Sequence, residues 1–243
     1  MILQLKQLQI NDTNMLEEAL AGLYSMISNM LPVDSKVDRI ILIGAHGTGK
    51  TTLANKLKEL LGITVVESVS REFHKDMEYL EDEGILDKRV SKVDTVSALQ
   101  NVICSMSRWD YMRWIDVDEA VIMTRCPLDT LAYAKADQDV TSDIYIQNLN
   151  ILKENQEFMD SLKTSLFVYL PIEFGIEDDG TRPIDKEFQK AVDQAMRDLM
   201  YEFQITPLVV TGTVKERVEQ ILVKIVGKDT AKSIMIESML SLL

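Results

Sequence analysis

Cysteine is scarce in this sequence: only Cys104 and Cys126 occur among 243 residues, far apart and in unrelated patterns. We therefore expect neither a disulfide framework nor a cysteine-based metal cluster, and a reducing cytoplasmic setting is the simplest one. Basic residues are also in the minority, since 26 Lys and Arg face 39 Asp and Glu and leave a net charge of −13. Such an acidic chain argues against non-specific binding to a nucleic-acid backbone or to an anionic membrane.

Long apolar runs are missing as well. No run approaches the ~20 residues that span a bilayer, and the first residues lack the basic and apolar regions of a signal peptide, so we expect no membrane association. The chain is still 46% hydrophobic, enough at this length for a sizeable core. Residues 228–243 predict an amphipathic helix that packs on the core or on a partner, because they carry too few lysines for a membrane-surface helix.

After residue 37, short apolar runs alternate with helical patterns. This alternation predicts right-handed crossovers and an α/β fold, a five-stranded parallel sheet between two layers of helices over 38–227. Residues 1–37 predict an appended strand and helix, and a homo-oligomer could form through that helix or the C-terminal one. The expected strands are 39–43, 63–67, 120–124, 165–170 and 207–211, and the expected helices begin at 50, 92, 143, 185 and 214 and end at 61, 116, 162, 203 and 226.

A glycine-rich stretch joins the first expected strand to the first expected helix. It fits Gly-x-x-x-x-Gly-Lys-Thr, in which glycines let backbone N–H groups close around phosphate oxygens and the helix N-terminus faces the same anion. Lys50 would bridge the terminal phosphates, and the Thr51 hydroxyl would ligate Mg²⁺. His46 holds a variable position and is expected to face solvent. The predicted site for ATP and Mg²⁺ comprises Gly44, His46, Gly47, Thr48, Gly49, Lys50, Thr51 and Thr52.

Glu67 stands directly after the second expected strand, and Arg71 follows four residues later. Parallel strands end at one edge of a sheet, so a carboxylate there can accept the proton of an attacking hydroxyl group. Arg71 would share this face and contact a substrate phosphate or ribose. The alternative is a plain ion pair between the two residues at the start of a helix.

Aromatic residues gather in the long helical stretch before the third expected strand, which holds both tryptophans of the chain, Trp109 and Trp114. An aromatic face in this region can stack on a base, so Trp109 is a candidate substrate residue. The helical spacing of these residues also fits ordinary core packing. Both interpretations stay open.

The segment after the third expected strand, 124–133, reads Thr-Arg-Cys-Pro-Leu-Asp-Thr-Leu-Ala-Tyr. It resembles the Asp-Arg-Ser-x-x-Asp-Thr-x-Ala-Tyr stretch of P-loop kinase-like proteins of an AAA-domain family related to ribosylnicotinamide kinases. It is also similar to the Asp/Glu-Arg-Ser element of deoxynucleoside kinases. The resemblance implies that Arg125 reaches the phosphates or the substrate, unless it is a buried structural arginine, and Asp129 matches too. Thr124 departs from the family's metal-organising acid, which leaves Glu67 or Asp129 to take part of that role.

Two later segments resemble the same family, so that the resemblance covers roughly 39–226. Residues 171–183 resemble its acidic lid element with Arg182, and 210–218 resemble its strand–Gly–Glu-Arg-Val segment. A lid would exclude water and bring Arg182 to the transferring phosphoryl group. The alternative is a solvated acidic loop in which Arg182 pairs with Asp178 or Asp179.

Together these features predict a small-molecule kinase. It would move the γ-phosphoryl group of ATP to a nucleoside, nucleoside monophosphate or ribosylnicotinamide-like acceptor, with Lys50, Glu67, Arg125 and Arg182 as catalytic residues and Thr51 on the metal. A GTPase is disfavoured because the guanine-specifying Asn-Lys-x-Asp pattern is absent. Two alternatives remain open: an NTPase that hydrolyses ATP in a partner complex, and a non-catalytic ATP-binding regulatory module, which Thr124 favours.

Overall fold

The five predicted strands form one sheet in the computed structural model, which describes residues 39–67, 92–115, 117, 119–175 and 185–240. All recorded pairings are parallel, in the order β2-β3-β1-β4-β5, so the predicted α/β fold with a five-stranded parallel sheet is confirmed. The predicted strand and helix of 1–37 lie outside the described residues. The strands are β1 Arg39–Ile43, β2 Thr64–Val66, β3 Val121–Met123, β4 Ser165–Tyr169 and β5 Leu208–Val209.

Alternate residues of the central strand β1 face two separate apolar cores. Ile41 and Ile43 belong to one core, and Ile40 and Leu42 to the other. Every residue of β1 is buried, which explains its continuous apolar sequence, because a strand covered on both faces has no solvent side.

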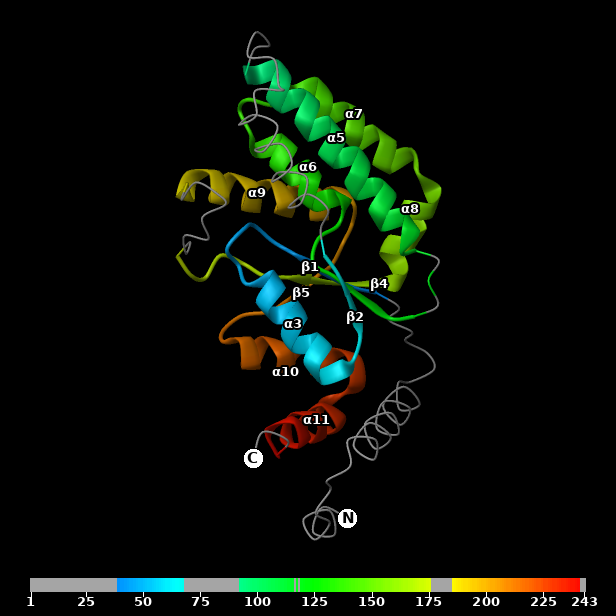
Figure 1. Cartoon of the computed structure of the whole chain (residues 1–243), viewed down its shortest axis with the longest axis vertical. Coiled ribbons are helices and arrows are strands. Elements are labelled where there is room, and N and C mark those ends of the chain that lie inside the picture. The colour runs from blue at the N-terminus through cyan, green and yellow to red at the C-terminus, as the bar shows by residue number, and fades with distance from the viewer. Residues whose placement is uncertain (1–38, 68–91, 116, 118, 176–184, 241–243) are drawn as a thin grey trace, which may run out of the picture.

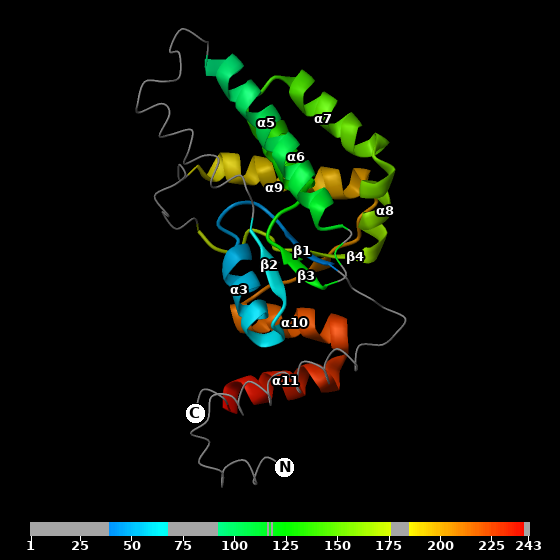
Figure 2. The ribbon, with the colours of Figure 1, turned by 45° about the vertical axis from the view of Figure 1, so that its right-hand side comes forward.

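Two layers of helices cover the sheet (Figures 1 and 2). On one side lie α5, α6, α7, α8 and α9, and on the other lie α3, α10 and α11. Ala231 and Ile234 of α11 are buried in the same core as α10, so the C-terminal helix packs on the core. The helices are α3 Lys50–Leu61, α5 Lys92–Arg113, α6 Pro127–Ala136, α7 Ser142–Glu154, α8 Gln156–Thr164, α9 Lys186–Glu202, α10 Val214–Val226 and α11 Lys228–Leu240.

Two helical details differ from the prediction. The single helix expected over 143–162 is two helices, because Asn155 leaves the helical region (φ −83°, ψ 101°) and caps α8 by accepting a hydrogen bond from the Phe158 N–H. Helix α6 was not predicted; it begins at Pro127, in a position where proline's missing N–H is not needed. No helix in the described part of the chain is long and apolar enough to cross a membrane.

Candidate functional site

The glycine-rich loop lies between β1 and α3 and depends on backbone conformations that only glycine adopts readily. Gly44, Gly47 and Gly49 have φ values of 144°, 73° and 89°. A Cβ atom at Gly44 would stand 2.5 Å from the Leu170 carbonyl oxygen at the end of β4. The loop therefore passes so close to the neighbouring strand that the first glycine of the pattern is required for space as well as for conformation.

The N-terminus of α3 opens onto this loop. Its N-cap, Gly49, has no side chain with which to cap the helix, and the N-terminus of a helix is where anions bind. The Lys50 ammonium donates to the carbonyls of Gly44 (2.6 Å) and Ala45 (2.7 Å), across the loop. Thr51 and Thr52 are exposed in the first helical turn. The loop thus presents backbone N–H groups, one ammonium group and hydroxyl groups, the groups that recognise a triphosphate.

His46 does not face solvent, and the prediction that it does is wrong. Its side chain is only 5% exposed because Tyr133 of α6 and Phe188 of α9 cover it. His46 Nδ1 lies 3.2 Å from the Tyr133 hydroxyl. Phosphate binding does not require a particular residue at position 46. Here the His46 side chain anchors the loop to helices α6 and α9.

A pocket lies at the carboxyl ends of β2 and β3. Strand β3 is the neighbour of β1 in the sheet, and β2 lies beyond β3. Three of its residues carry charge: Glu67 after β2, Arg125 after β3, and Asp110 on α5. Burial raises the pKa of Asp110, while the Arg113 charge acts in the opposite direction. The pocket holds about 10 Å³, room for about one water molecule, and combines two carboxylates and one guanidinium group. Its lining residues are Val66, Glu67, Ser107, Asp110, Tyr111, Met123 and Arg125.

Asp129 lies fully buried between the loop and this pocket. Its Oδ2 accepts a hydrogen bond from the Cys126 N–H at 2.9 Å, whereas its Oδ1 is buried without a hydrogen-bond partner in the described structure. Burial raises the pKa of Asp129, and the charges of Lys50 and Arg125 oppose that rise. Asp129 therefore couples the loop lysine electrostatically to the pocket arginine.

Two oxygen donors of the kind that Mg²⁺ prefers occur here: the exposed Thr51 hydroxyl in the first turn of α3, and the buried Asp129 Oδ1, which has no hydrogen-bond partner in the described structure. Within the described residues, no group of three or more His, Cys, Asp or Glu side chains could hold a metal by itself. A cation here would thus take much of its coordination from water and from nucleotide phosphates, as Mg²⁺ usually does.

Thr124 and Arg125 come directly after β3, and their side chains lie in different environments. The Arg125 guanidinium lies 5.3 Å from the centre of the Tyr133 ring. Burial acts to lower the pKa of Arg125, but Tyr133 and Asp129 outweigh it, so its pKa is raised and it stays charged. The Thr124 hydroxyl donates to the Val66 carbonyl between the strands, at 3.3 Å. Thr124 thus forms part of the sheet edge and supplies no carboxylate.

Trp109 is not brought to the pocket. Ser107, Asp110 and Tyr111 share the pocket face of α5, and Trp109 is not among the lining residues. Its side chain is 65% exposed under the Arg113 guanidinium, so the core-packing interpretation is wrong for Trp109, whereas Tyr111 of the same helix is buried in the core and Trp114 packs against that core. Arg71 and Arg182 lie outside the described residues, so their predicted roles stay predictions.

Three residues with contacts at the site were not predicted as site residues: Asp110, Gln189 and Arg217, although Arg217 lies in the Glu-Arg-Val segment that resembles the family. Gln189 and Arg217 bond the loop from α9 and α10. Asp110 could have been found from its spacing, because it lies three residues after Ser107 and one before the buried Tyr111. For the other two, the contacts span 143 and 169 residues of sequence, which no local pattern encodes.

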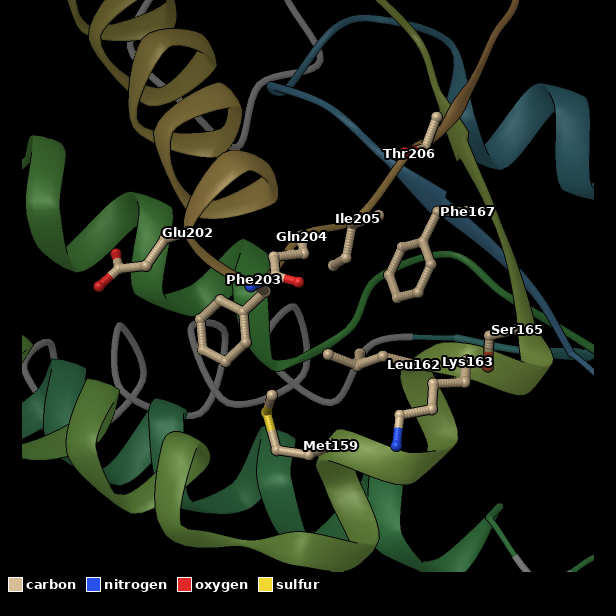
Figure 3. Close-up of a pocket in the computed structure, with 10 residues that line it drawn as sticks. All are labelled: Met159, Leu162, Lys163, Ser165, Phe167, Glu202, Phe203, Gln204, Ile205 and Thr206. Atoms are coloured by element: carbon tan, nitrogen blue, oxygen red, sulfur yellow. The ribbon is translucent and has the colours of Figure 1, made fainter.

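A second pocket, of about 310 Å³, lies at the opposite edge of the sheet, where β4 begins (Figure 3). Its floor is apolar, with Phe167 and Phe203 buried. Its two charged residues are paired outside it, Lys163 with Asp160 and Glu202 with Lys153. Because both charges are paired with residues outside the pocket, neither is positioned to orient a ligand there. The candidate site therefore lies at the carboxyl edge of the sheet, where open parallel sheets usually bind their ligands.

Solved structures of two other proteins are similar to this chain in fold. A deoxyadenosine kinase from M. mycoides with bound dATP is similar with a TM-score of 0.54 and 16% identity, over 76% of this chain and 97% of that chain. The NadR protein in complex with NR is similar with a TM-score of 0.55 and 16% identity, over 78% of this chain and 52% of that chain, so this chain spans about half the length of NadR. Identities this low establish a shared fold, the P-loop kinase-like fold.

Comparison of the sequence, rather than of the fold, identifies a family. No curated protein matches the chain significantly. The family profile described as AAA domain matches residues 39–217, from the start of β1 to the first turn of α10. That range contains the glycine-rich loop, the pocket residues and Asp129, and it exceeds half of the sequence; the chain therefore belongs to this AAA domain family.

Proposed function

We propose that the protein is an ATP-dependent, Mg²⁺-dependent kinase that phosphorylates a nucleoside, a nucleoside monophosphate or a ribosylnicotinamide-like acceptor. The observation that carries the proposal is the group of Glu67, Asp110 and Arg125 at the carboxyl ends of β2 and β3, the edge of the sheet at which the glycine-rich loop leaves β1. The similarity in fold to a deoxyadenosine kinase and to NadR supports the proposal.

The residues of the pocket suit phosphoryl transfer. Glu67 is exposed at a strand end, where its carboxylate can take the proton of an acceptor hydroxyl. The acceptor oxygen then forms a bond to the γ-phosphorus, the bond from that phosphorus to the β,γ-bridging oxygen breaks, and ADP leaves with the electron pair. Lys50 and Arg125 would neutralise the charge that shifts during this transfer, and Arg182 would add to them from the segment after β4. Mg²⁺, when bound with the nucleotide, would supply further charge neutralisation.

Asp110 and Arg125 give the acceptor side of the pocket both signs of charge. A carboxylate can accept from a ribose or base N–H or O–H donor, and a guanidinium group can hold a phosphate in two parallel hydrogen bonds. These groups suit an acceptor with a sugar and with either a polar base or a phosphate.

The test is incubation of the protein with Mg²⁺ and ATP labelled in its γ-phosphate, against a panel of deoxynucleosides, nucleoside monophosphates and nicotinamide riboside. We expect label in one class of acceptor. Glu67→Gln should lower turnover by roughly 10²–10⁴-fold with little change in ATP affinity, and the matched control Glu119→Gln, an exposed carboxylate just before β3, should leave both unchanged.

Two outcomes contradict the proposal. Release of labelled inorganic phosphate without any labelled acceptor would identify a hydrolase. Tight ATP binding without turnover on the whole panel would identify a regulatory binding module, in agreement with Thr124, whose hydroxyl is occupied by the Val66 carbonyl.

A further inference from the structure

Two buried side chains from distant helices hold the glycine-rich loop by its carbonyl groups. Gln189 Nε2 of α9 donates to the His46 carbonyl at 2.7 Å, and an Arg217 terminal nitrogen of α10 donates to the Thr48 carbonyl, also at 2.7 Å. Gln189 is 3% exposed and Arg217 is 2% exposed, so neither bond competes with bulk water. The two helices thus grip alternate peptide units of one loop.

The peptide bond converts this grip into an orientation of the loop's donors. A planar trans peptide points its C=O and its N–H in opposite directions. The peptide units 46–47 and 48–49 turn their oxygens towards α9 and α10, which lie on opposite sides of the sheet, so the N–H groups of Gly47 and Gly49 each point away from the helix that holds their own peptide unit. Both glycines have positive φ values, of 73° and 89°, and both are exposed. Backbone N–H groups of a glycine-rich loop in such conformations can form an anion-binding concavity.

Arg217 is itself held in place. Its other terminal nitrogen pairs with the Glu173 carboxylate at 2.6 Å, and its guanidinium lies 5.2 Å from the centre of the Phe174 ring. The Glu173 carboxylate also accepts from the Gly212 N–H at 3.0 Å. Arg217 therefore connects the end of β4, the turn before α10 and the loop, and its guanidinium is fixed before any ligand arrives.

We propose that Gln189 and Arg217 are positioning residues for the phosphate site: they fix the two peptide units so that the N–H groups of Gly47 and Gly49 stand ready for phosphate oxygens. The inference rests on the proposed triphosphate site and adds to it the residues that preorganise it. Neither side chain touches the phosphate; each acts through a backbone carbonyl. Without the grip, the peptide units would have to be ordered when the ligand binds, and that ordering would weaken the affinity.

The test measures binding of Mg²⁺-tripolyphosphate, a probe that has only the phosphate part of the ligand, by titration calorimetry. Gln189→Leu keeps the size of the side chain but removes the donor, and we expect it to weaken binding by roughly tenfold, the effect of one lost hydrogen bond. Arg217→Met should weaken binding at least as much. The matched control is Gln194→Leu on the exposed side of α9, where the amide bonds only Asp198; it should bind as the wild type does.

A second variant separates positioning from mere stabilisation. Gln189→Glu places a carboxylate against the His46 carbonyl at neutral pH, but its protonated form can donate as glutamine does. Its affinity relative to the wild type at the same pH should therefore recover as the pH falls towards about 5, since a buried carboxyl group protonates above its usual pKa of ~4.3. A purely structural effect would change the thermal midpoint without this recovery in affinity per folded molecule.

The outcomes distinguish the two proposals. Folded Gln189 variants that bind tripolyphosphate within twofold of the wild type at all pH values would overturn the positioning role and leave the nucleotide site intact, even if Arg217→Met does not fold. A folded wild-type protein that binds neither tripolyphosphate nor ATP would overturn the proposed function, and the positioning role with it.

Discussion

Gly44→Ala should destabilise the protein more than any other single added methyl group at a glycine of the site. The new Cβ would stand 2.5 Å from the Leu170 carbonyl oxygen, about 0.9 Å closer than the 3.4 Å at which ordinary contact begins. Leu170 resists displacement because its N–H bonds the Ile43 carbonyl at 2.9 Å. The φ of 144° at Gly44 adds conformational strain for any residue with a Cβ.

The magnitude follows from these two contributions. Overpacking against a fixed backbone costs ~1–3 kcal/mol, and a non-glycine residue in a glycine-only conformation costs ~1–3 kcal/mol. We therefore expect the free energy of unfolding to fall by roughly 2–6 kcal/mol, measured by urea denaturation. In the fraction that folds, the loop should shift at its first residue, and ATP affinity should fall as well.

Two other glycines separate the contributions. Gly227 has a φ of 80° and a ψ of 166°, a conformation almost restricted to glycine, but open space where its Cβ would be, so Gly227→Ala should cost only the conformational part, ~1–3 kcal/mol. Gly175 has open space and no positive φ, so Gly175→Ala should be neutral or slightly stabilising. The reasoning is refuted if Gly44→Ala is no less stable than Gly227→Ala.

Three further predictions concern the helical layers. Burial raises the pKa of Tyr111 to about 12. The unfolded chain therefore loses the Tyr111 proton first, and the free energy of unfolding falls as the pH rises from about 10 to 12. When denaturation at pH 9 is compared with denaturation at pH 12, Tyr111→Phe should remove ~2–3 kcal/mol of that loss. Phe158→Ala should cost ~3–5 kcal/mol by urea denaturation, because Phe158 is 1% exposed and its ring packs edge-on against Tyr111 and Phe203. Thr213→Ala should cost ~1 kcal/mol in the same assay by removing the N-cap of α10, whereas Thr52→Ala, exposed in α3, should change little.

Local patterns were enough for the five strands, for most of the helices and for the loop. The run Arg39–Ile43 had to be a covered strand because it is apolar without alternation, and the glycine spacing after it had to form a phosphate loop. Helix α10 was predicted at its observed bounds, and Thr213 and Glu216 form a reciprocal cap at its start. The break at Asn155 was missed because the apolar spacing continues across it, although asparagine is a common N-cap residue and caps α8 here.

The sequence by itself determined that a parallel α/β sheet carries a phosphate-binding loop, because periodicity, caps and glycine requirements act over a few residues. Tertiary structure alone decided the strand order β2-β3-β1-β4-β5, the burial of His46 under Tyr133 and Phe188, and the meeting of Glu67, Asp110 and Arg125 in one pocket. It also decided the grip of Gln189 and Arg217 on the loop. These features depend on contacts between segments distant in the chain, and such contacts are fixed by the shape of the packed core rather than by any local pattern.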